Sequence, residues 1–215
     1  MVELHMGKNK IINMKSINNY ILEKLVINKN SGKKHYNYFP KTKEELQDII
    51  EQRIKEEGNK CDLNDIDVSK IDNMSYLFRK SKFNGDISEW DVSSVKYMNG
   101  MFKGSKFNQD ISNWDVCSVK DMERMFYQSK FNKDISKWDV SKVTNMYEMF
   151  EQSNFNKDIS KWNVSNVESM EYMFYDSKFN QDISNWDISN VEDMSWIFKQ
   201  TPLDGKEKEW WGRTE

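Results

Sequence analysis

Carboxylates recur at a fixed interval along this chain, so they are the first side chains to consider for chemistry. One aspartate series repeats every 24 residues from Asp86, and a second begins at Asp91. Carboxylates stacked about 5 Å apart repel one another by roughly 1 kcal/mol per neighbouring pair in water, and a bound Ca²⁺ is one way to offset this repulsion. We favour a structural interpretation, because aspartate at a turn accepts hydrogen bonds from nearby backbone N–H groups. The second series is Asp91, Asp115, Asp139, Asn163 and Asp187.

Tryptophans follow the same interval, and their rings are suited to stacking on sugars. Trp90 and Val92 lie two residues apart, so in an extended segment they point to one side while Asp91 points to the other. Because Val92 is apolar, we predict that the tryptophans are buried in the core and do not form a sugar platform. The series is Trp90, Trp114, Trp138, Trp162 and Trp186. The asparagines Asn84, Asn108, Asn132, Asn156 and Asn180 are predicted to satisfy turn backbone between neighbouring units.

Catalytic residues are hard to find in this sequence. His5 and His35 are its only histidines, and it has no Cys–His pair, Gly-rich phosphate loop or HExxH motif. Cys61 and Cys117 lie about two repeats apart, which is too far for a disulfide. Most Asp and Ser residues occupy the same slot in nearly every unit, as scaffold residues do. We therefore expect no enzyme activity, no cofactor and no metal centre.

The elements that must position these side chains are repeats, because the chain contains six tandem copies of a 24-residue unit. One unit, starting at Asp86, reads DISEWDVSSVKYMNGMFKGSKFNQ. The alternation that ends at Trp90 and Val92 is typical of a short strand, whereas Val95, Met98 and Phe102 follow a helical spacing. A period of this length indicates a solenoid. We predict an α/β repeat solenoid with strands at 88–92, 112–116, 136–140, 160–164 and 184–188, and with helices near 94–104 and every 24 residues thereafter.

The repeat also resembles a known family. Units reading FNxDISxWDVSxVxxMxxMF are similar to those of the bacterial BspA-like leucine-rich-repeat proteins, many of which are labelled surface proteins. The resemblance covers about residues 61–203. It implies a leucine-rich-repeat-like solenoid of parallel strands and helices, in which the concave sheet face contacts ligands. It also implies an exported, adhesive protein.

The repeats leave shorter segments at both ends of the chain. Residues 1–42 form an N-terminal segment with a predicted short helix at 17–26. Residues 43–60 are predicted to be a capping helix, because Thr42 and Glu45 form a capping box ahead of an apolar stripe and Gly58 follows as a stop signal. The repeats fill residues 61–203, and 204–215 form a C-terminal cap in which Trp210 and Trp211 fold over the last unit.

Charge and hydropathy limit the classes of partner. Residues 1–60 hold 12 Lys and Arg against 8 Asp and Glu, whereas residues 61–215 hold 20 against 27. An acidic body disfavours nucleic acid, whose binding depends on neutralising phosphates. No apolar run is long enough to span a membrane. The first residues lack the apolar core of a signal peptide, which predicts a cytoplasmic location, whereas the family resemblance implies the cell surface.

Recognition of another macromolecule is the function that we predict, through a non-enzymatic scaffold for protein binding or adhesion. A core requires the same residues in each unit, whereas a binding face is free to vary. Exposed Tyr and Trp are enriched in interfaces, and several fall on the predicted helix side at variable slots: Tyr97, Tyr127, Tyr147, Tyr172, Tyr175 and Trp196. The alternatives are a structural subunit of a particle or filament, which would form oligomers, and a carbohydrate- or calcium-binding surface protein.

Overall fold

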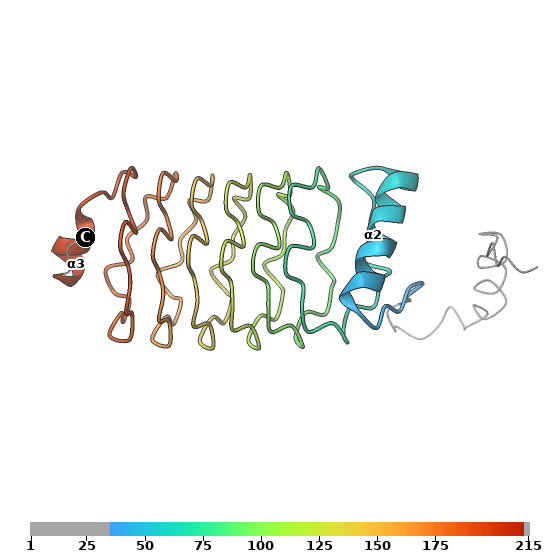
Figure 1. The fold of residues 1–215 in the computed structure, drawn as a ribbon, viewed down its shortest axis with the longest axis horizontal. Helices are drawn as coiled ribbons and strands as arrows, with labels where there is room; N and C mark the ends of the chain where they lie inside the picture. Colours follow the sequence, from blue (N-terminus) through green and yellow to red (C-terminus); the bar gives the residue numbers. More distant parts are fainter. Residues whose placement is uncertain (1–34, 213–215) are drawn as a thin grey trace, which may run out of the picture.

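Six stacked coils form the body of the protein, with a helix at each end (Figure 1). The computed structural model describes residues 35–212, so the predicted short helix at 17–26 lies outside the described residues. Within this range the helices are α2, Lys43–Glu57, and α3, Lys206–Trp211. We number the coils from the N-terminal side; coils 1 to 6 cover residues 62–85, 86–109, 110–133, 134–157, 158–181 and 182–205.

Each coil is a succession of tight turns. In coil 2 the Trp90 N–H donates to the Ile87 carbonyl at 3.2 Å and the Met101 N–H donates to the Met98 carbonyl at 3.1 Å. The next turn closes from the Phe102 carbonyl to the Ser105 N–H at 3.0 Å. The same turns recur in the other coils. The chain therefore changes direction every few residues and returns to its starting side after one unit.

The predicted α/β repeat solenoid is wrong, because neither its strands nor its helices are present in residues 35–212. In place of strands at 88–92, 112–116, 136–140, 160–164 and 184–188, the coils have turns joined by short irregular segments. The segment 94–104 and its equivalents contain consecutive turns instead of a helix. Parallel pairing is limited to isolated bridges, chiefly the series Asn73, Tyr97, Asp121, Asn145, Ser169 and Asp193.

Backbone conformation explains why the helical spacing misled the prediction. A turn that closes after three residues brings residues i and i+3 to the same side, as a helix does. Two positions per coil, however, have φ between 49° and 67°, which no right-handed helix contains. Coil 2 has Gly100 and Gly104 there, and both suit this conformation. In the other coils these positions are Tyr76, Lys80, Arg124, Gln128, Glu148, Gln152, Tyr172, Asp176, Trp196 and Gln200.

A ladder of backbone hydrogen bonds joins each coil to the next. The N–H groups of Met98 and Phe102 donate to the carbonyls of Asp121 and Met125 in coil 3, at 3.0 and 2.9 Å. Gly100 donates in the same direction, and the pattern repeats along the stack. A helix would use these N–H groups within its own segment, whereas here they depend on the neighbouring coil. We call this set of bonds the ladder.

The core consists of apolar columns, and the predicted burial of the tryptophans is confirmed. Trp138 is 3% exposed, and its ring lies parallel to that of Trp114 with centroids 6.5 Å apart. Its Nε1–H donates to the Ile111 carbonyl of the preceding coil at 3.1 Å. The predicted asparagine series is also confirmed, since the Asn132 N–H donates to Asn108 Oδ1 at 2.9 Å. Buried aromatic rings thus continue unbroken from coil to coil.

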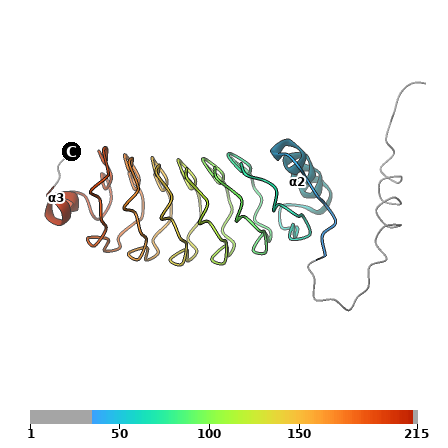
Figure 2. The ribbon, with the colours of Figure 1, turned by 90° about the horizontal axis from the view of Figure 1, so that it is seen from below.

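The spacing of the columns shows that the stack is curved. Ring centroids in the column that starts at Phe78, beside the ladder, lie 5.5–5.9 Å apart. In the columns that start at Phe83 and Trp90 they lie 6.2–6.5 Å apart. Figure 2 shows the coils fanning apart toward one side. The wall that carries the ladder is therefore the concave wall.

Helices at the two ends cover the first and last coils. Thr42 Oγ1 accepts the Glu45 N–H at 3.2 Å, and Leu46 is fully buried against the core. Arg53 fastens α2 to coil 1 through Asp65, with its Nη1 2.8 Å from Oδ1. At the other end the ring of Trp211 stacks on Phe198, with centroids 5.8 Å apart. The 24-residue period places Trp210, and not Trp211, at the position of the repeated tryptophans. The Trp210 ring instead meets the Phe198 ring edge-on.

Candidate functional site

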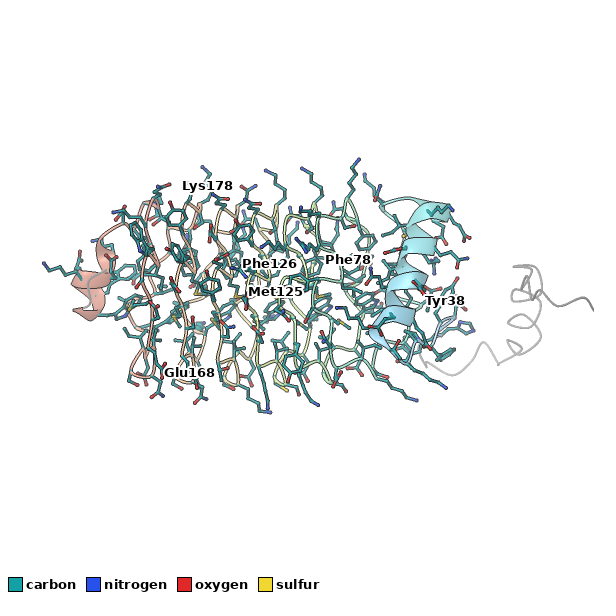
Figure 3. The ribbon with its side chains drawn as sticks, viewed as in Figure 1. Tyr38, Phe78, Met125, Phe126, Glu168 and Lys178 are labelled. Carbon is teal, nitrogen blue, oxygen red and sulfur yellow. The ribbon has the colours of Figure 1, made fainter. Side chains whose placement is uncertain are left out.

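The outward residues beside the ladder differ from coil to coil, and we call them the variable face. In coil 2 they are Lys96, Tyr97, Asn99, Gly100, Lys103 and Gly104, and in other coils they are the residues at multiples of 24 positions away. In coil 5 this face runs between Glu168 and Lys178, which Figure 3 labels at opposite edges of the stack. The tight turns direct most of these side chains outward while Met and Phe point into the core, and among the polar side chains Ser75 and Glu148 are buried exceptions.

The structure places all six predicted binding residues on this face, although the wall consists of turns and not of the predicted helices. Tyr97 and Trp196 are 42% and 39% exposed. The other four, Tyr127, Tyr147, Tyr172 and Tyr175, are partly exposed. They do not form one patch, because Tyr97 and Tyr127 lie in coils 2 and 3 whereas the remaining four lie in coils 4 to 6.

An aromatic cluster joins coils 4, 5 and 6. Tyr172 is at its centre, with its ring parallel to that of Trp196 and a centroid separation of 6.3 Å. Tyr147 and Tyr175 meet Tyr172 edge-on, at 6.4 and 5.5 Å. Four partly exposed aromatic rings therefore make one continuous surface.

Charged residues beside this cluster form a network that the sequence did not reveal. The Arg124 guanidinium lies over the Tyr147 ring, 4.8 Å from its centroid. It also donates to both carboxylate oxygens of Glu148, at 2.7 and 2.9 Å. Nearby, the Lys103 ammonium lies 4.2 Å from the centroid of the Tyr127 ring. The only available signal for these residues is that they occupy the same variable slots as the aromatic residues, one or more units away.

Ionisation in this network is perturbed. Burial opposes the charge of Glu148, but hydrogen bonds from Arg124 and Tyr147 lower the pKa of its carboxyl. The hydrogen bond to Glu148 raises the pKa of the Tyr147 hydroxyl. Burial and then the Glu148 charge raise the pKa of Glu151 to about 7. Burial, with the charges of Asp193 and Glu148, also raises the pKa of Glu171. The face therefore carries carboxylates whose charge is only partly compensated.

The aspartate columns have a structural role. Asp139 Oδ1 accepts the Ser141 N–H at 3.0 Å, and hydrogen bonds from the Ser141 hydroxyl and N–H lower the pKa of Asp139. Asp134 accepts the Ser136 N–H at 2.9 Å in the same way. Each carboxylate thus stabilises the turn that follows it. In the part of the chain that the structure describes, no group of three or more His, Cys, Asp or Glu side chains is placed to hold a metal ion.

Comparison with protein families supplies the identification. The family model described as "Mycoplasma protein of unknown function, DUF285" matches residues 45–153 and 127–211, which together span most of the chain. The chain belongs to this family. The two overlapping DUF285 matches cover the capping helix α2 except its first two residues, all six coils and α3. Neither the curated proteins nor the solved structures contain a match to the chain.

Membrane insertion through a helix is not seen in the described region. Neither α2 nor α3, the helices found between residues 35 and 212, has the length and apolarity needed to cross a bilayer.

Proposed function

We propose that this DUF285 protein is a non-enzymatic scaffold that binds another protein through the variable face, as an interaction or adhesion module. The observation that supports this most is the contrast between invariance and variation within one repeat. The buried columns keep the same residue type in nearly every coil, whereas each position of the variable face changes. Within the coils, the exposed large aromatic residues Tyr76, Tyr97 and Trp196 all lie on that one face, a concentration that a purely structural stack does not require.

Two alternatives are less well supported by the structure. A sugar platform on the tryptophan column would require exposed rings, but Trp114 and Trp162 are each 4% exposed. A filament of end-to-end subunits would require free terminal coils, but α2 and α3 lie across the two ends (Figure 1). Curvature adds a further argument, because the variable face is on the concave wall and can surround part of a partner.

A paired capture experiment tests the proposal. The purified protein is immobilised, exposed to an extract of its source cells, and the bound proteins are quantified by mass spectrometry. Tyr147→Ala combined with Tyr172→Ala should weaken the specific partner by at least about 1–2 kcal/mol, the usual cost of removing an interface anchor. Asp115→Asn combined with Asp139→Asn, on another side of the stack, is the control and should change little. Equal losses with both pairs, or a loss with only the aspartate pair, would reject the variable face.

A further inference from the structure

Charge divides the variable face into two halves. Coils 1 and 2 place four basic residues on this face: Arg79, Lys80, Lys96 and Lys103. Their one acidic residue on the face is Asp72, whose Oδ2 lies 3.5 Å from the Lys96 Nζ. Coil 5 has no Lys or Arg on the face. Its acidic residues there are Glu168, Glu171 and Asp176, and coil 6 adds Glu192 and Asp193 together with one basic residue, Lys199. The aromatic cluster therefore lies in the acidic half.

The protein itself shows how this type of surface holds a basic group. Arg124 places its guanidinium over Tyr147 and donates two hydrogen bonds to the carboxylate of Glu148. At the far end, the Lys199 ammonium lies 5.7 Å from the centroid of the Trp196 ring. A cation held over an aromatic ring and beside a carboxylate gains from both interactions. The same combination, a ring with nearby carboxylates, recurs around Tyr172, where coils 4 and 5 contribute no further basic side chain to the face.

We propose that the patch formed by Tyr172, Tyr175, Trp196, Glu151 and Glu171 binds a basic, Arg- or Lys-rich segment of the partner protein. This inference rests on the proposed function, since it names the partner chemistry for the same face. Lys or Arg side chains of the segment lie against the aromatic rings, and the carboxylates neutralise their charge.

The charges around the aromatic cluster support a cationic partner. Glu171 precedes Tyr172 in the chain, and Glu151 occupies in coil 4 the slot that Tyr175 fills in coil 5, so both carboxylates belong to the same part of the face as the aromatic cluster. Burial and then the charges of Glu171 and Glu151 raise the pKa of the Tyr172 hydroxyl. The charge of Glu148 acts on both Glu151 and Glu171, and a cation bound nearby relieves this repulsion. An acidic or uncharged partner would leave the carboxylates of coil 5 without counter-charges.

A labelled peptide provides a direct test on the full-length protein. Fluorescein-labelled hexa-arginine amide is titrated with the protein at low ionic strength, and binding is followed by fluorescence anisotropy. We expect saturable binding, and a Kd raised about tenfold by Tyr172→Ala with Tyr175→Ala, which leaves the net charge unchanged. Trp196→Ala is a second variant at a more exposed position and should raise the Kd in the same direction. Thermal unfolding by circular dichroism verifies that each variant is folded.

Matched controls separate a specific site from general attraction to an acidic protein. Asp115→Asn with Asp139→Asn removes two charges elsewhere on the stack and should change the Kd less than about twofold. An equal loss in this control, or no binding of hexa-arginine by the wild type, overturns the proposed basic segment. Native partner capture that still depends on Tyr147 and Tyr172 would then leave the proposed function standing. Loss of that dependence as well would reject both proposals.

Discussion

Gln152 provides a test of the turn conformation that replaces the predicted helix. Its φ is 52°, its N–H donates to the Tyr175 carbonyl of the next coil at 2.8 Å, and its side chain is exposed. We compare Gln152→Gly with Gln152→Ala. Both variants lose the same side-chain hydrogen bond from Gln128, whose Nε2 lies 2.5 Å from Gln152 Oε1, so that loss cancels in the comparison.

The expected difference follows from backbone energetics. A residue with a Cβ pays about 1–2 kcal/mol in the left-handed region, and glycine does not. Glycine loses about 0.5–1 kcal/mol more backbone entropy than alanine on folding. The glycine variant should therefore be more stable than the alanine variant by about 0.5–1 kcal/mol. In a helix the order would be reversed, with alanine better by about 1 kcal/mol.

Equilibrium unfolding in urea, monitored by tryptophan fluorescence, measures the free energy of unfolding of each variant. The exposed Lys142, which lies outside the ladder, provides a site where Gly and Ala substitutions report only general effects. An alanine variant of Gln152 that is more stable than the glycine variant would refute the turn and favour the helix. The sign of the difference decides the result, so errors common to both variants do not matter.

Three further predictions concern the core, the concave wall and pH. Trp138→Ala should reduce the free energy of unfolding by about 3–5 kcal/mol. Trp138→Phe should reduce it less, because an aromatic ring stays in the column. Equal reductions for the two variants in urea unfolding would contradict the stacking. Gly100→Ala should reduce the free energy of unfolding by about 2 kcal/mol, since the added Cβ would lie 2.2 Å from the Tyr76 ring. In a double-mutant cycle, Tyr76→Ala should restore part of this lost stability. An absence of coupling between the two substitutions would disprove the contact. Folding holds a proton on Glu151, whose pKa rises from 4.5 to about 7, so its contribution to stability is present below pH 4.5 and is lost as the pH rises through about 7. Glu151→Gln should therefore be more stable than the wild type at about pH 8 and similar to it at about pH 5. A stability difference that does not change with pH would reject the raised pKa of Glu151. This pKa also depends on the adjacent charges of Glu148, Arg124 and Lys103.

The sequence predicted what depends on the identity of side chains within one unit. The inward orientation of Trp90, the turn-capping role of Asp86 and the helix that follows Thr42 all depend on neighbouring residues, and the structure contains each of them. The conformation of the segment 94–104 could not be predicted in the same way, because its N–H groups bond to the next coil. Gly100 and Gly104 were an available signal, since two glycines in one predicted helix argue against it.

The candidate site was predicted only in part. Tyr172 and Trp196 were identified as aromatic residues in variable slots, and they do lie together. Arg124 and Glu148 were missed, because they are 24 residues apart and their pairing follows from the stacking of coils. Charged residues are common in this chain, so neither one stands out until the third dimension brings them beside Tyr147.

The ladder gives the concave wall an electrical polarity. In coils 1 to 5, four N–H groups of the concave wall, such as that of Met98, point toward the C-terminal end. The N–H groups of Lys96, Lys106 and Asn108, and their equivalents in other coils, point back from the edge of this wall and from other parts of the coil. Aligned peptide groups add their dipoles, as in a helix, so this wall has its positive end at the C-terminal coils. The acidic residues of coils 5 and 6 and the basic residues of coils 1 and 2 match that dipole. An exchange of the two halves of the repeat array would therefore destabilise the protein even if every buried column stayed intact.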